Sequence, residues 1–397
     1  MNVLVLNCGS SSVKFQLIDT TERGRERRLA GGTIERIGEA EAAIAFRAEG
    51  HPAHRETAAV PDHATAVQRV ADWVATRAAA VGAVGHRVVH GGPRFTRPTL
   101  VDDDVTAGIE ALETLAPLHN APSLAGIRAA RRALGPEVPM VAVFDTAFHA
   151  TLPDHAARYA LPEELVRRHA IRRYGFHGTS YRSVLLQYGR LTGTSPERAT
   201  LIALHLGNGC SVAAIRGGQS VDTSMGFTPL EGLVMGTRAG DLDPAIVSHL
   251  ARAERVSPDE VERWLNERSG LLGVSGHSRD MRALLDRERE DPRARLAVEI
   301  FCYRAKKYIG AYLAALGGAE SVVFTGGIGE HAPEVRARIC AGMEWCGLVL
   351  DPERNARLTG EGVRISGDQA RIRAFVIPTD EELVIGRDTI DCLKPRA

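Results

Sequence analysis

The sequence predicts an α/β protein made of two similar halves, and three observations indicate this fold class. Short apolar runs suited to buried strands alternate along the chain with longer segments of helical spacing. Two strand–turn–strand segments with small-residue turns occur, one near the start of each half. The chain has 397 residues, which is long for a single hydrophobic core, so we expect two domains.

The first half opens with the first of these hairpins. Residues 2–6 form a continuous apolar run, and residues 13–18 alternate apolar with polar side chains, so two strands flank the turn at 7–12. The same reasoning predicts a helix at 65–81, a strand at 83–89, a helix at 123–134 and a strand at 140–144. This alternation favours a sheet with helices on its faces.

The second half repeats the plan. Residues 200–206 and 211–215 predict a second hairpin around a glycine-rich turn. Then come a buried helix at 293–316 capped by Gly317 and Gly318, a strand at 321–325 that ends in a glycine turn, a helix near 333–345 and a strand at 372–377. The two hairpins suggest an internal duplication, with a cleft between the halves.

Composition excludes several classes of protein. The formal net charge is zero and no long basic stretch occurs, which argues against a nucleic-acid binder. No apolar run is long enough to span a membrane, and the first residues lack the features of a signal peptide, so we expect a cytoplasmic protein. The six cysteines form no CxxC pair, so neither a disulfide framework nor a zinc site is indicated.

Three glycine-rich turns are candidate phosphate or nucleotide contacts, because small residues let backbone N–H groups approach an anion. They are 7–14, which contains three serines and Lys14; 205–209, in the second hairpin; and 325–330, after a strand. A hairpin turn that binds no phosphate would have the same sequence pattern. None fits the P-loop pattern, and no GxGxxG opens a helix after an N-terminal strand.

Charged residues beside glycines are the other candidates. Arg87 and Arg238 each lie close to glycines, and an arginine fork suits carboxylate or phosphoryl oxygens. Asp145 directly follows a predicted strand, and Glu381 lies in the segment PTDEE. Both carboxylates suit Mg²⁺, although helix caps would place acidic residues in the same way.

Taken together, these segments resemble the acetate kinase family across nearly the whole chain. The matching stretches are LVLNCGSSSVKF, VGHRVVHGG, LAPLHN, FDTAFH, YGFHGTS, HLGNGCS, TPLEGLVMGTRAGDLDP, FTGGIGE and PTDEEL. The resemblance implies the sugar-kinase, heat-shock-chaperone and actin type of fold: two duplicated actin-like ATPase (ribonuclease H-like) domains with a central cleft. We expect one domain from 1–150 plus 382–397 and a nucleotide-binding domain from 151–381.

The resemblance also implies an activity and residue roles. The expected reaction is reversible, in-line transfer of the ATP γ-phosphoryl group to acetate with Mg²⁺, or alternatively Mn²⁺, by a homodimer. The implied catalytic residues are Arg87, Asp145, His177 and Arg238; the implied acetate pocket is Arg87, Val89, Leu118, Phe176 and Pro229; Asn7 and Glu381 are the implied metal ligands. The implied nucleotide contacts are Asn7, Ser10, Ser12, Lys14, His205, Leu206, Gly207, Asn208, Gly209, Asp280, Met281, Arg282, Gly326, Gly327, Ile328, Gly329 and His331, and His119 also matches an active-site position.

Two departures and three alternatives stay open. Tyr181 stands where the family usually has histidine, which puts one phosphate-side contact in doubt, and His331 stands where it usually has asparagine, which leaves nucleotide preference open. The nearest alternative is a propionate kinase of the same family, since one methylene is worth only about 1–3 kcal/mol in a pocket. A sugar or polyol kinase and a non-catalytic actin-like ATP switch are the others.

Overall fold

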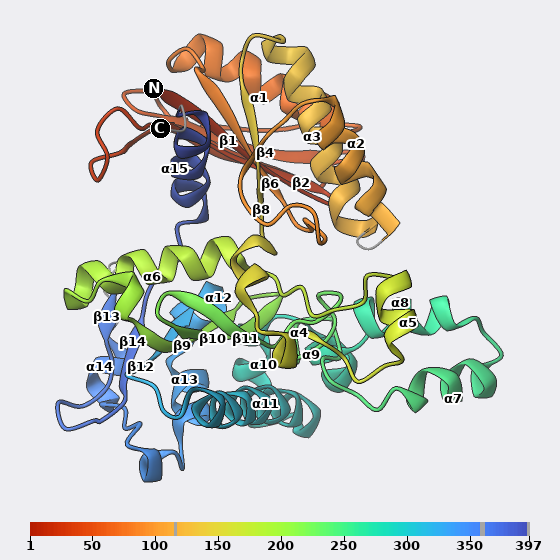
Figure 1. Cartoon of the computed structure of the whole chain (residues 1–397), viewed down its shortest axis with the longest axis vertical. Coiled ribbons are helices and arrows are strands. Elements are labelled where there is room, and N and C mark those ends of the chain that lie inside the picture. The colour runs from red at the N-terminus through yellow and green to blue at the C-terminus, as the bar shows by residue number, and fades with distance from the viewer. Residues whose placement is uncertain (115–116, 358–361, 395–397) are drawn as a thin grey trace. The chain divides into compact units, whose positions relative to one another are not determined.

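The computed structural model describes residues 1–114, 117–357 and 362–394 of the chain (Figure 1). These residues divide into two compact units, the first comprising Met1–Phe148 and Asp380 onward, the second His149–Thr379. In the described part of the chain, no helix combines the length and the apolar character that crossing a membrane would require.

Unit 1 is built on an eight-stranded sheet of order β5-β4-β3-β2-β1-β6-β8-β7. Its strands are β1 (Asn2–Gly9), β2 (Ser12–Asp19), β3 (Arg27–Glu35), β4 (Ala42–Ala48), β5 (His54–Ala58), β6 (Ala83–Val88), β7 (Thr99–Leu100) and β8 (Met140–Phe144). Its helices are α1 (His63–Arg77), α2 (Asp103–Ala111), α3 (Pro117–Leu134) and α15 (Glu381–Leu393).

Strand β1 shows why this sheet is covered on both faces. Leu4 and Leu6 pack into the core beneath α1 and α3, whereas Val3 and Val5 pack into a second cluster with Ile385 of α15. Successive side chains of a strand point to opposite faces, so a continuous apolar run requires cover on both sides. The C-terminal helix therefore completes the core of the N-terminal unit. Figure 1 shows this helix, α15, beside the sheet of unit 1.

Unit 2 contains a six-stranded sheet of order β11-β10-β9-β12-β14-β13. Its strands are β9 (Thr200–Leu206), β10 (Cys210–Arg216), β11 (Gln219–Thr223), β12 (Ser321–Thr325), β13 (Val363–Arg364) and β14 (Arg373–Val376). Its helices are α4 (Asp154–Ala157), α5 (Glu163–Arg168), α6 (Gly178–Thr192), α7 (Ala245–Glu254), α8 (Pro258–Glu267), α9 (Gly270–Ser275), α10 (Met281–Arg287), α11 (Pro292–Leu316), α12 (Gly326–His331), α13 (Pro333–Cys340) and α14 (Pro352–Ala356).

The two sheets share one core topology, which supports the predicted duplication. In unit 1 an antiparallel hairpin, β1–β2, is extended by the parallel strands β6 and β8. In unit 2 the hairpin β9–β10 is extended in the same way by β12 and β14. Parallel strands place their carboxyl ends at one edge of a sheet, so residues that follow β6 and β8, or β9 and β12, gather there.

Four predicted elements differ from the structure, and one of them, the helix expected at 123–134, begins earlier, at Pro117. The glycine segment after β12 is a short helix, α12, rather than a turn. The helix expected near 333–345 ends at Cys340, because Ala341 is extended and Gly342 has a φ of +74°. The helix expected at 65–81 ends at Arg77, since Ala78 leaves the helical region although the apolar spacing continues to Val81.

Candidate active site

Arg87 and Asp145 form the centre of the polar site in unit 1. Arg87 lies on β6, and Asp145 follows the neighbouring parallel strand β8, so the sheet brings them together. The Arg87 Nε donates to both carboxylate oxygens at 3.1 Å, and Nη2 donates to Oδ2 at 2.5 Å. The Asp145 side chain is 1% exposed, so this carboxylate aims and neutralises the arginine rather than facing solvent.

Four more polar side chains lie around this pair. Asn7, on β1, accepts a hydrogen bond from Arg87 Nη1 at 3.1 Å. Glu381, in the first turn of α15, lies 3.7 Å from Arg87 Nε, and its neighbour Glu382 pairs with Lys14 at 2.6 Å. Burial raises the pKa of Glu381 to about 7; Arg87 opposes this shift, and the nearby carboxylates of Asp145 and Glu382 add to it.

This group has the chemistry of a cation site. Three carboxylates (Asp145, Glu381, Glu382) face two cationic side chains (Arg87 and Lys14), so the surroundings favour a further positive charge. Oxygen ligands suit Mg²⁺, which keeps several waters and needs few protein ligands. The described residues contain no cluster of three or more His, Cys, Asp or Glu side chains placed to hold a metal.

His177 and Arg238 come together in unit 2 around Gly209. A Cβ atom built on Gly209 would lie 3.6 Å from both His177 Nε2 and Arg238 Nη1, so the absence of a side chain leaves room between the two donors. Arg238 Nη1 donates to the carbonyl of Pro229 at 3.3 Å, which ties the arginine to a predicted acetate-pocket residue. Burial lowers the pKa of the Arg238 guanidinium.

Local structure fixes the orientation of His177. It is the N-cap of α6 and has a φ of +59°, a backbone conformation that is uncommon for a residue with a side chain. Its ring stacks on that of His205, with centroids 4.2 Å apart. The hairpin β9–β10 that carries His205 and Gly209 therefore also positions His177.

A pocket of about 1260 Å³ lies beside the β9–β10 turn in unit 2. Eight of its lining residues are predicted nucleotide contacts: Gly207, Asn208, Asp280, Met281, Arg282, Gly327, Ile328 and His331. Glycine is required at the neighbouring Gly326, which has a φ of +77° and where a Cβ would lie 2.8 Å from the carbonyl oxygen of Leu206. Close packing of α12 on β9 thus shapes this end of the pocket.

The other predicted residues lie elsewhere. His205, Leu206, Gly209, Gly326 and Gly329 flank the pocket without lining it. Asn7, Ser10, Ser12 and Lys14 belong to the β1–β2 hairpin of unit 1. Val89 is buried in unit 1, Phe176 is buried in unit 2, and the side chains of Leu118 and His119 lie outside the described residues.

Tyr181, which stands where the family usually has histidine, has a buried side chain. Its side chain is 0% exposed and points into unit 2, where its hydroxyl hydrogen bonds with Ser211. The family's usual histidine contact is therefore not replaced by an exposed phenol.

Several residues of this region were not predicted from the sequence. Arg279, Asp286, Arg289 and Glu334 also line the pocket, and the HSRDMR segment around 277–282 could have drawn attention to the first of them. The fully buried Arg336 holds α12 by donating to the carbonyls of Gly329 and Glu330 at 2.8 and 2.9 Å. Nothing in the local pattern distinguishes Arg336 from a surface arginine.

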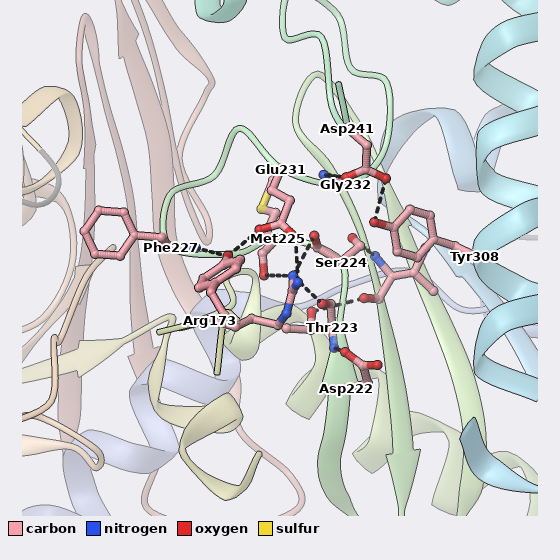
Figure 2. A network of polar contacts seen from close by, with 12 residues as sticks. Arg173, Asp222, Thr223, Ser224, Met225, Phe227, Glu231, Gly232, Asp241 and Tyr308 are labelled. Atoms are coloured by element: carbon pink, nitrogen blue, oxygen red, sulfur yellow. Dashed lines mark hydrogen bonds and ion pairs between the residues drawn. The ribbon is translucent and has the colours of Figure 1, made fainter. Parts of the chain in front are cut away.

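A second missed network holds the segment that carries Pro229, as Figure 2 shows. Arg173 donates to the carbonyls of Thr223, Ser224 and Met225 at 3.1–3.3 Å and pairs with Glu231 at 2.6 Å. Glu231 also accepts a hydrogen bond from Tyr159, whose hydroxyl in turn accepts the backbone N–H of Phe227. These hydrogen bonds satisfy backbone groups of this irregular segment that have no partner in a β-sheet.

Comparisons with known proteins agree over the whole chain. The sequence profile described as the acetokinase family matches residues 2–387. Proteins named acetate kinase from Solibacter usitatus and Chloroherpeton thalassium are 56% and 52% identical to this chain, covering 99% of it and 98% and 99% of their own lengths.

Solved structures give the same result for the fold. An acetate kinase from Porphyromonas gingivalis and a propionate kinase from Francisella tularensis each superpose with a TM-score of 0.90, at 40% and 39% identity. Each match covers 99% of this chain and 100% of the other. The predicted pair of actin-like ATPase domains is thereby confirmed.

Proposed function

This chain belongs to the acetokinase family, and from that premise we propose that it is an acetate kinase, an ATP:acetate phosphotransferase that forms acetyl phosphate and ADP. The observation that carries the proposal is the pairing of Arg238 with His177 around Gly209, beside a pocket lined by predicted nucleotide contacts. Two donors at the edge of such a pocket suit a phosphoryl group that carries developing negative charge.

The chemistry needs charge stabilisation more than proton transfer. Acetate is already ionised at neutral pH, so no general base is required to make it a nucleophile. The obstacle is repulsion between a carboxylate and a polyphosphate. We assign Arg87 and Arg238 to holding the carboxylate and phosphoryl oxygens, His177 to donating a hydrogen bond to the phosphoryl group, and Asp145 to fixing the Arg87 fork.

We place the divalent cation at the carboxylate-rich group of unit 1, with Asn7 and Glu381 as protein ligands. When bound there, Mg²⁺ would neutralise charge on phosphate oxygens. The same oxygen ligands accept Mn²⁺, so the choice of metal stays open. The homodimer and the cytoplasmic location stay predictions of the sequence.

Propionate is the second candidate substrate. The propionate kinase of Francisella tularensis matches this chain as well as the acetate kinase of Porphyromonas gingivalis does, at 39% and 40% identity. Because a methylene changes the binding free energy by only about 1–3 kcal/mol, acetate and propionate should both react. The ratio of their kcat/KM values then gives the substrate preference of the enzyme.

Hydroxylamine trapping tests the proposal directly. The purified protein is incubated with ATP, Mg²⁺, hydroxylamine and one of formate, acetate, propionate or butyrate, and acyl hydroxamate is measured. We expect acetate to give the highest kcat/KM. As a control for contaminating kinases, Arg238→Ala should give about a hundredfold less product. Absence of hydroxamate with every carboxylate, or equal product from Arg238→Ala, would refute the assignment.

A further inference from the structure

A second cavity of unit 2, of about 700 Å³, adjoins the pocket that holds the predicted nucleotide contacts. Helices α11 and α13, which contact each other, and the segment that follows α10 supply its walls. Glu288 and Arg289 line both cavities, whereas the other residues that line this one are absent from the walls of the nucleotide pocket. The second cavity is therefore a separate feature, which the proposed reaction does not use.

Charged side chains dominate this cavity. Its four cationic residues are Arg289, Arg295, Lys306 and Arg338, and its two acidic residues are Glu288 and Glu299. Four positive charges against two negative charges leave an excess of two positive charges. Arg295, Glu299 and Lys306 stand four and seven residues apart on α11, a spacing that places them on one face of the helix. The fold therefore gathers the charges in one place.

A single carboxylate, Glu288, faces three of the cations. Arg338 donates two hydrogen bonds to it, at 2.7 and 2.5 Å. The hydrogen bonding from Arg338 lowers the pKa of Glu288, burial opposes that shift, and the charges of Arg295 and Arg289 lower the pKa further. Three guanidinium groups thus share one carboxylate, which Arg338 already occupies.

The remaining cations lack an acidic partner of their own. Within the described part of the chain, no carboxylate forms an ion pair with Arg289, Arg295 or Lys306. Arg295 is held instead by a hydrogen bond of 3.3 Å from its Nε to the carbonyl of Glu288. Glu299 does not pair with Arg295, although ion pairs form at their spacing on a helix. Like charges gathered in one cavity repel one another, and a bound anion removes that repulsion.

We propose that this cavity binds an oligophosphate anion. Guanidinium forks match the oxygens of phosphate groups, and an oligophosphate carries enough charge to neutralise the excess of the lining. Tyr303, whose side chain is 64% exposed, adds a hydroxyl donor to the same cavity. Inorganic oligophosphate and the phosphate chain of a second nucleotide present the same chemistry, and the experiment distinguishes these two sources.

Calorimetric titration tests the site. Arg295→Gln combined with Lys306→Gln removes two cations that line this cavity and not the nucleotide pocket. Tripolyphosphate is titrated at fixed ionic strength into protein saturated with ADP. We expect the parent protein to bind tripolyphosphate and the double variant to bind it with a Kd about tenfold higher, since each partly exposed cation contributes about threefold in affinity. Should the double variant not fold, Lys306→Gln alone should raise the Kd about threefold.

Arg252→Gln combined with Arg268→Gln is the matched control. Both arginines are exposed, line neither cavity and lie in unit 2, so this variant loses the same charge at another surface. We expect it to bind tripolyphosphate with the Kd of the parent protein. An equal loss of affinity in both double variants would show a general charge effect and overturn the site.

Titration of ADP alone identifies the source of the oligophosphate. One ADP per chain in the parent protein, with tripolyphosphate binding to the ADP complex, assigns the cavity to inorganic oligophosphate. Two ADP per chain, with one bound about tenfold more weakly in Arg295→Gln combined with Lys306→Gln, assigns it to a second nucleotide. The proposal is overturned when neither ligand depends on these two cations.

Acyl hydroxamate formation, measured on the same preparations, keeps the site and the proposed function apart. Neither double variant alters a residue of the candidate active site, so both should retain the kcat of the parent protein. Hydroxamate formation without oligophosphate binding overturns the site and leaves the proposed function intact. Oligophosphate binding without hydroxamate formation supports the site and overturns the proposed function.

Discussion

At the residue scale, the buried His86 predicts that the folded protein loses stability as the pH falls. It lies in the middle of β6 and is 2% exposed, and burial, with a smaller effect from Arg131, lowers its pKa from 6.5 to about 3. The unfolded chain therefore binds one more proton than the folded chain between these values. The contribution of His86 to stability is complete above pH 6.5 and is lost as pH falls toward 3, at about 1.4 kcal/mol per pH unit.

Urea unfolding at a series of pH values checks this prediction. Between pH 6.5 and 4.5 we expect the parent protein to lose about 2 kcal/mol more unfolding free energy than His86→Gln. His51→Gln, at an exposed position, should leave the pH dependence of the parent protein unchanged. Identical pH slopes for the parent and His86→Gln would show that the buried imidazole does not control acid stability.

At the scale of elements, the irregular segment 223–241 depends on Arg173 (Figure 2). Arg173→Met leaves three carbonyls without this donor and Glu231 without its partner cation. Since these side chains are 17% and 32% exposed, solvent screens part of the loss, and we expect a cost of about 2 kcal/mol. Glu231→Gln removes the charge but keeps an acceptor for Tyr159.

A double-mutant cycle measures this coupling by urea unfolding. Removing one partner of a partly buried pair leaves an uncompensated charge, so Arg173→Met with Glu231→Gln should cost about 1 kcal/mol less than the sum of the single variants. Strict additivity would mean that the ion pair does not stabilise the segment.

Elements also show which structure could be predicted from sequence. Strands with continuous apolar runs, such as β8, β9 and β12, were placed correctly because burial on both faces leaves a plain local signal. Strand β3 was missed because Gly31 and Gly32 look like a break in the chain. In the structure a Cβ on Gly32 would collide with the backbone of β4, so these glycines record a close strand approach that no local pattern reveals.

The candidate site was likewise predictable only where its residues belong to a recognisable local pattern. Gly207, Asn208 and His331 were found because they belong to glycine-rich motifs in the sequence. The hydrogen bond between Tyr181 and Ser211 depends on α6 packing against β10, which sequence spacing does not show. The buried partners of the predicted site residues are therefore the part of the site that requires coordinates.

At the scale of the whole molecule, the two units share a core topology and differ in what they can bind. Unit 1 gathers carboxylates around Arg87, whereas the pocket with the predicted nucleotide contacts is lined by unit 2 alone. The two halves of the duplicated fold therefore differ: unit 1 carries the carboxylate-rich group around Arg87, and unit 2 carries the pocket with the eight predicted nucleotide contacts. Ligand binding should reveal this division as unequal protection of the two units.

Hydrogen exchange with ADP tests that division. A ligand at a hundred times its Kd stabilises the state that binds it by about 2.7 kcal/mol, so amides that exchange only by opening the pocket should slow about a hundredfold. We expect slowing in α10 and α12 of unit 2, which line the pocket, and none in the edge strand β5 of unit 1 and its neighbour β4. Sulfate at matched ionic strength is the control for general anion effects. Slowing confined to unit 1 would contradict the assignment, because a nucleotide bound in this pocket must first protect the helices that form its walls.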